Sequence, residues 1–278
     1  MADTNPQTKP TTWSLFSAAV LLAFAADATL IQHHTGADSP QWYWVLTVGL
    51  VIALCALAGY LVNQRIDGIL INDRNRISLG RLQWVAWLIV LMSGLFVEAL
   101  WNAGIGADHG AAIPTMPDQL LALLGIVSGT TVVGGVISNS KKQTAPVAAP
   151  TAAGAASAPV AAGDSPLNAG QMDANASPAE ASWADLYLGE EVANRYVVDI
   201  SRLQKLLITI ILVGIYIGWL WNELHGKGPF PSLPGLGADN GNNTFLWLLG
   251  ISHAGYIASK ATPKTTAGVQ GGVPAQDQ

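Results

Sequence analysis

The chain has 278 residues, of which half are apolar and only 11% carry a charged side chain. Soluble domains carry roughly 25% charged residues, so this composition excludes an ordinary soluble protein and indicates an integral membrane protein. The formal net charge of −5 is small and no basic patch is present, so we expect no nucleic-acid partner. Cys55 is the only cysteine, which excludes an intrachain disulfide.

Six apolar segments have the composition of membrane-spanning helices. They cover residues 13–30, 44–62, 84–101, 120–137, 203–221 and 244–258. A helix needs roughly 20 residues to cross the hydrocarbon core, and only the last segment is clearly short for this. The predicted fold is therefore an all-α integral membrane protein with six transmembrane helices. For the first segment a cleaved secretory signal is the alternative, because Ala23-Phe24-Ala25 resembles a cleavage site.

Two leading spans, in residues 1–64, precede a sequence that occurs twice. Residues 68–83 align without a gap with residues 189–204. Each copy runs into an apolar span that ends in Leu-Trp-Asn and then, across a loop, into Leu-Leu-Gly-Ile. Agreement in all these blocks, in the same order, predicts an internal duplication of about 75 residues per unit. We assign residues 65–142 to the first two-helix repeat and residues 183–264 to the second.

The segment between the two repeats has a different composition. Residues 143–182 consist mostly of Ala, Pro, Gly, Ser and Thr. Such a segment cannot bury enough apolar surface to offset the entropy of ordering it, so we expect a disordered linker. Residues 265–278 are expected to form a disordered tail. Because both repeats begin and end on one side of the membrane, they should be parallel rather than inverted.

Basic residues set the expected orientation, since the cytoplasmic loops of membrane proteins are enriched in Lys and Arg. If the N-terminus is cytoplasmic, Lys227 is the only one of the 13 Lys and Arg residues that lies outside. Both termini and the linker are then cytoplasmic. The chain should also contact membrane lipids.

The duplicated segment supplies the candidate contacts to lipid or to a partner protein. Arg81 and Arg202 fall in the first turn of a membrane helix, where the helix dipole disfavours a cation, so each should meet a compensating anion or partner. Ser78 and Asp199 precede these turns and can cap them. The complete set of candidate contact residues is Arg74, Arg81, Gln83, Arg195, Arg202 and Gln204. Either these residues anchor the helices among lipid head groups, or they dock a cytoplasmic protein.

The segments that lead into the two repeats differ in pattern. Residues 69–71 and 76–79 flank a polar Asn-Asp-Arg-Asn run, which is typical of a small turn or hairpin. In the second repeat, residues 183–194 instead predict a short amphipathic helix at the membrane interface.

Small residues predict where the membrane helices pack. Gly125 and Gly129 form a G-x-x-x-G pattern, and Gly250 with Ala254 repeats the small-x-x-x-small spacing. Such spacings allow helix backbones to approach closely, so helix packing is the expected role of these four residues.

Ionisable residues inside a membrane span are candidates for function. Glu98 should reach the outer interface, and His253 lies deeper, near the middle of a short helix. His253 should hydrogen-bond Ser128, Ser252 or a backbone carbonyl; the alternative is an ion path through His253 and Glu98. The remaining histidines match no metal motif, and no sequence motif of a known catalytic site is present, so we expect neither a metal, a cofactor nor an enzyme.

Three short segments carry a resemblance to a known group of proteins. They are S-L-G-R-L-Q at residues 78–83, D-L-Y-L-G-E-E at residues 185–191 and L-G-I-S-H-A-G-Y at residues 249–256. The chain resembles bacterial inner-membrane proteins of uncharacterised function that carry a duplicated S-L-x-R-x-Q followed by L-L-G-I-S. Val127 departs from this pattern in the first copy. The resemblance implies an inner-membrane location and two-helix repeats, and it implies no catalytic or binding residue.

Two functions follow as hypotheses. The duplicated cytoplasmic motif favours a non-enzymatic inner-membrane scaffold or anchor that docks a cytoplasmic protein partner. The alternative is a small channel or transporter formed by the paired repeats, assembled as a homo-oligomer, with His253 and Glu98 in its path.

Overall fold

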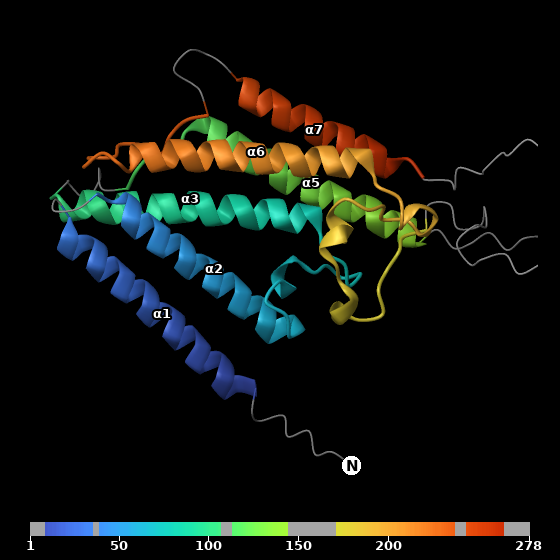
Figure 1. The fold of residues 1–278 in the computed structure, drawn as a ribbon, viewed down its shortest axis with the longest axis horizontal. Helices are drawn as coiled ribbons and strands as arrows, with labels where there is room; N and C mark the ends of the chain where they lie inside the picture. The colour runs from blue at the N-terminus through green and yellow to red at the C-terminus, as the bar shows by residue number, and fades with distance from the viewer. Residues whose placement is uncertain (1–8, 36–38, 107–112, 144–170, 237–242, 264–278) are drawn as a thin grey trace, which may run out of the picture.

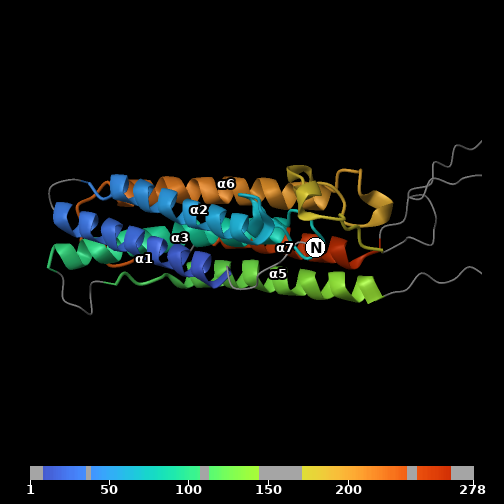
Figure 2. The ribbon, with the colours of Figure 1, turned by 90° about the horizontal axis from the view of Figure 1, so that it is seen from below.

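The computed structural model describes residues 9–35, 39–106, 113–143, 171–236 and 243–263. These residues form six α-helices, which are α1 (Lys9–His34), α2 (Gln41–Asn63), α3 (Leu79–Gly104), α5 (Asp118–Gln143), α6 (Ile200–Glu223) and α7 (Thr244–Ala261). Within the described residues, extended backbone pairs only in isolated bridges, so the prediction of an all-α fold is confirmed. Successive helices run in opposite directions along one long axis (Figures 1 and 2).

Four of the helices, α2, α3, α5 and α6, are long and apolar enough to cross a membrane. The structure therefore agrees with a helical membrane protein. The first and last helices, α1 and α7, also form where the sequence predicted them. That all six helices cross the membrane, and that the last four are a duplication, stays a prediction.

The centre of the bundle is α3, which contacts α1, α2, α5 and α6. Its Trp87 is fully buried and packs edge-on against Tyr216 of α6 and Phe245 of α7, with ring centroids 5.9 and 6.1 Å apart. The Trp44 indole of α2 donates a hydrogen bond to Ser93 of α3 at 2.8 Å. Large aromatic side chains thus hold three neighbouring helices against α3.

Both predicted helix caps are present. The Ser78 hydroxyl accepts from the Arg81 amide at the start of α3. Asp199 accepts from the amides of Ser201 and Arg202 at the start of α6, at 3.0 and 3.4 Å. Each side chain satisfies backbone N–H groups that the first turn leaves without a partner.

The hairpin before α3 is confirmed, whereas the amphipathic helix before α6 is not. Ile71 pairs with Ile77 across the turn. Residues 183–194 form two short 3₁₀ helices instead of one α-helix, Trp183–Leu186 and Val192–Asn194. Gly189 lies between them, where a Cβ would lie 2.2 Å from the Asn194 side chain, so this close approach requires glycine.

The predicted linker is shorter than residues 143–182. Residues 171–182 lie in the described part and pack against the hairpin before α3: the Asn175 amide donates to the Arg74 carbonyl at 3.0 Å, and Ala181 is buried. Backbone hydrogen bonds with the hairpin compensate for a composition that by itself favours disorder. The rest of the predicted linker, residues 144–170, and the predicted tail lie outside the described residues.

Within a single chain, the small residues do not lie at the close helix contacts that their spacing predicted. A Cβ added at Gly125, Gly129 or Gly250 would meet no atom within 4 Å, and Ala254 is exposed. Helices α5 and α7 do contact each other. The contact between α5 and α7 instead includes buried polar side chains, Thr130 and His253.

Candidate functional site

One end of the bundle carries a polar cap. We call the end at which α3 and α6 begin the polar end, and the opposite end the far end. The cap consists of residues 65–78 and 171–199, which fold over the polar end beside the last turns of α5 and α7 (Figure 1). Its two segments come from opposite sides of the Ala/Pro-rich region, so contacts between them are long-range.

Glu190 is the centre of the charges in the cap. Its carboxylate lies 2.6 Å from the Lys260 ammonium, 3.4 Å from the Arg74 guanidinium, and is also paired with Arg202. Burial by itself would raise the pKa of Glu190, but Arg202, Lys260 and Arg74 together hold that pKa well below its usual range. The hairpin, α6 and α7 therefore meet at one ionised carboxylate.

A second buried ion-pair cluster surrounds Arg76, which the sequence analysis did not select. Its guanidinium pairs with Asp185 at 3.0 Å and with Asp173 at 3.2 Å, and it donates to the Gly189 carbonyl at 2.9 Å. Asp185 also accepts from the Ile77 amide. Residues about a hundred positions apart thus neutralise each other. The sequence feature that could have indicated this cluster is the acidic D-L-Y-L-G-E-E segment, because its carboxylates need basic partners when they are buried.

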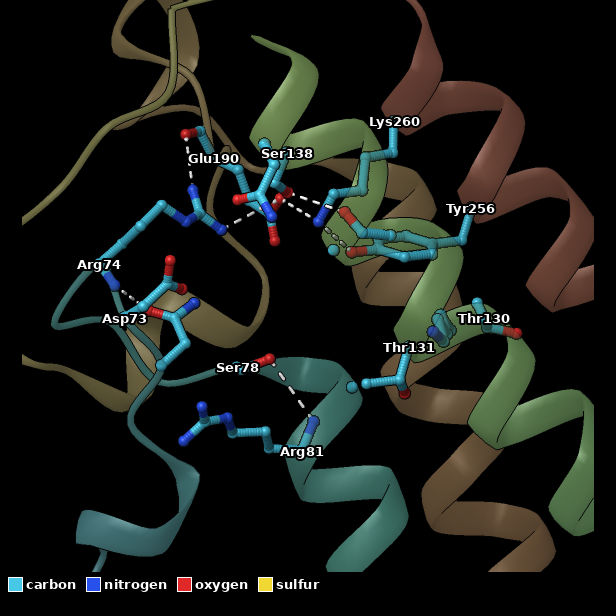
Figure 3. A pocket seen from close by; sticks show the side chains of 16 residues that line it. Asp73, Arg74, Ser78, Arg81, Thr130, Thr131, Ser138, Glu190, Tyr256 and Lys260 are labelled. Atoms are coloured by element: carbon cyan, nitrogen blue, oxygen red, sulfur yellow. Dashed lines mark hydrogen bonds and ion pairs between the residues drawn. The ribbon is translucent and has the colours of Figure 1, made fainter. Parts of the chain in front are cut away.

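A pocket of about 280 Å³ lies at the polar end between the hairpin, the start of α3, and α5, α6 and α7 (Figure 3). The charged residues of its lining are Asp73, Arg74, Arg81, Glu190, Lys205 and Lys260. Hydroxyl groups of Ser78, Thr131 and Tyr256 also line it. The lining is therefore polar and carries more cations than carboxylates.

Lys205 has an unusual environment in this pocket. Its side chain is 1% exposed, and its ammonium lies over the Tyr256 ring, 4.1 Å from the centroid. Among the described residues, the ammonium of Lys205 has neither a hydrogen-bond acceptor nor a carboxylate partner. The Arg81 guanidinium donates to the Ile71 carbonyl, and in the described part of the chain no carboxylate is paired with it.

Below the pocket, four helices share a buried polar cluster of Gln83, Thr130, Thr209 and His253. Thr130 Oγ1 lies 2.6 Å from His253 Nδ1, and Gln83 Nε2 lies 3.4 Å from His253 Nε2. Gln83 also donates to Thr209, whose hydroxyl donates to the Lys205 carbonyl at 2.8 Å. His253 lies within hydrogen-bond distance of a hydroxyl group, but that of Thr130 on α5 rather than those of Ser128 or Ser252, which the sequence analysis named.

Glu98 does not reach the outer interface as the sequence suggested. Its side chain is fully buried within the bundle, and within the described residues neither carboxylate oxygen has a hydrogen-bond partner. The central position of α3 explains this burial, because helices surround it on several sides. Among the described residues, no chain of hydrogen bonds links Glu98 to His253.

Only half of the predicted lipid or partner contacts are accessible. Arg74, Arg202 and Gln83 are buried, at 5%, 2% and 1% exposure, and their hydrogen bonds and ion pairs stay inside the chain. Arg81 and Gln204 are exposed, whereas the Arg195 side chain is 40% exposed. Equivalent positions of the two copies are thus buried differently, because α6 turns Arg202 and Lys205 inward and Gln204 outward.

Comparisons of the chain with family models, with curated proteins and with solved structures found no match. Among the residues that the structure describes, no group of three or more His, Cys, Asp or Glu side chains could hold a metal ion. The site must therefore be interpreted from its own geometry.

We expect Glu190→Gln to destabilise the protein by about 3 kcal/mol at neutral pH, because it leaves several buried cations without their counter-ion. The lowered pKa of Glu190 means that its contribution is present above the unfolded-state pKa of about 4.3 and is lost as pH falls further. Denaturant unfolding in detergent at several pH values measures both effects.

The matched control is Glu180→Gln, which removes an exposed carboxylate from the same cap. It should change stability little. Equal stability of the two variants at neutral pH, or an unchanged acid response in Glu190→Gln, would contradict the central role of Glu190.

Proposed function

We propose that the chain is a non-enzymatic anchor or scaffold of the bacterial inner membrane, with the polar end in the cytoplasm. In this proposal six helices cross the membrane, and the last four are two parallel repeats joined by a cytoplasmic linker. The parallel directions of α3 and α6, and the equivalent caps Ser78 and Asp199, support the duplication. The concentration of Arg and Lys at the polar end supports the orientation.

The observation that carries the anchor function is the buried ion-pair network of the cap. Arg74 and Arg76 of the hairpin bind Glu190 and Asp185 of the second segment, which keeps the cap in one arrangement on the helix ends. Partner binding to a preformed surface costs less ordering entropy than binding to a flexible one. A fixed cap is therefore suited to docking.

The surface that we assign to the partner lies at residues 195–198. Tyr196 is 80% exposed and Val197 61% exposed, and the Arg195 guanidinium lies over the Tyr196 ring, 4.6 Å from its centroid. Exposed Tyr and Arg side chains are enriched among the residues that dominate binding energy at protein interfaces. Exposed Arg81, close to the start of α3, is suited instead to lipid head groups.

Site-specific photocrosslinking in native membranes tests the docking surface. A photoreactive residue at Val197 should give a discrete protein adduct, and Arg195→Glu should reduce it at least several-fold because charge and stacking are both lost. Position Val132, 66% exposed on α5, is the control and should not give that adduct. Adducts with lipid alone at Val197, or the same protein adduct from both positions, would contradict docking.

A second candidate, a small channel or transporter, is supported by the buried polar cluster. A chain of hydrogen bonds runs from the Lys205 carbonyl through Thr209 and Gln83 to His253, and these residues come from three helices. Water-lined paths through membrane proteins use such polar groups. In this proposal, the exposed Gly125 and Gly129 of α5 are suited to close contact with a second copy in a homo-oligomer.

Flux measurements in liposomes test the second candidate. A transporter or channel should move an ion or small solute, and His253→Leu should reduce the rate at least several-fold because it removes the centre of the polar cluster. Ser140→Ala, an exposed hydroxyl in the same helix as Thr130, is the control. Absence of flux for ions and phosphate at several pH values would exclude this function and leave the anchor proposal intact.

A further inference from the structure

We propose that the pocket at the polar end is a binding site for a small phosphate-bearing anion. The site is formed by Arg81 of α3, Thr131 of α5, Lys205 of α6 and Lys260 of α7. This assignment is independent of the anchor function, since the cap surface at residues 195–198 is not part of the pocket.

Charge balance is the first argument for an anion. Four cationic side chains line the pocket, and Asp73 and Glu190 are its only carboxylates in the described part of the chain. Glu190 is already shared among Arg74, Arg202 and Lys260. The lining therefore has more basic than acidic side chains, and a bound phosphate group would reduce this imbalance.

The environment of Lys205 is the second argument, because a buried cation indicates a specific binding site rather than a generally basic surface. Its ammonium is buried, and its only close partner among the described residues is the face of the Tyr256 ring. A buried charge without a hydrogen-bond acceptor is costly, so such groups are normally paired. An anion in the pocket supplies the acceptor that the chain does not.

The start of α3 borders the same pocket. The first amides of a helix lack intrahelical acceptors, and the positive end of the helix dipole favours an anion there. Gly80 lies in this turn and lines the pocket; a Cβ at Gly80 would lie 3.2 Å from Thr131 Oγ1. Helices α3 and α5 therefore approach closely at this turn, bringing the Thr131 hydroxyl beside it.

Geometry and size favour phosphate over a carboxylate. Residues with donor groups line the pocket from four different helices, which suits a tetrahedral group whose oxygens point in several directions. Ligand pockets usually measure about 300–1,000 Å³, so about 280 Å³ admits a phosphate with a small organic group. The phosphate can belong to a phospholipid head group or to a soluble compound, because the pocket lies at the end of the bundle.

The test is thermal unfolding of the full chain, delipidated in phosphate-free maltoside micelles and followed by tryptophan fluorescence. Potassium phosphate should raise the melting temperature in a saturable way, beyond the effect of potassium chloride at the same ionic strength. Lys205→Met should weaken phosphate binding about tenfold or more, since a charge-assisted hydrogen bond is lost. Arg81→Gln changes an exposed residue, a position that should tolerate substitution, and it should also weaken phosphate binding.

Lys227→Gln is the control, because it removes an exposed cation from outside the pocket, and it should bind phosphate like the unaltered chain. If free phosphate stabilises the protein in a saturable way, the ligand is a soluble phosphate compound. Stabilisation only in nanodiscs with anionic phospholipid, together with retained phospholipid in native mass spectrometry, assigns a head group. In either case binding must weaken in Lys205→Met. Binding of neither ligand, equal stabilisation by chloride, or no difference between Lys205→Met and Lys227→Gln would overturn the proposal.

Discussion

The arrangement of the polar end depends on one carboxylate that three cations share. Glu190 draws Arg74 of the hairpin, Arg202 of α6 and Lys260 of α7 to one point. Desolvating these charges is expensive, so the network contributes less to net stability than to the choice of one arrangement: any other would leave a buried charge without a partner. The same carboxylate cannot neutralise all the cations around it. The ion pairs of Glu190 hold the cap in place, but they leave uncompensated basic side chains in the pocket beneath it.

Much of the architecture could be predicted from composition and periodicity. Long apolar runs identify the helices because a membrane requires them, and Ser78 and Asp199 mark helix starts because free amides need acceptors. The cap could not be predicted in this way. Residues 171–182 have the composition of a linker, and hydrogen bonds from distant parts of the chain order them. Arg76 belongs with Asp185 only once the chain has folded, so no local pattern could identify it.

The alignment of residues 68–83 with residues 189–204 explains both what could and what could not be predicted at the candidate site. Aligning the copies correctly selected positions near the polar end, but it assumed that aligned side chains have the same environment. Arg81 is exposed, whereas Arg202 is buried beside Glu190; Gln83 is buried, whereas Gln204 is exposed. Helix α3 is surrounded on several sides and α6 is not, so equal sequences bury different faces. Lys205, which has no basic counterpart in the first copy, becomes the residue with the clearest chemical implication.

Hydrogen–deuterium exchange of residues 171–199 in the full chain tests the central claim most directly, namely that charged residues hold the cap in a fixed fold. The amides of Asn175, Gly189 and Asp199 donate hydrogen bonds to carbonyl groups within the cap, so their exchange should be much slower than that of an unstructured peptide at neutral pH. Exchange of this segment at the unstructured rate would contradict the account, because it would leave neither a preformed docking surface nor a closed pocket.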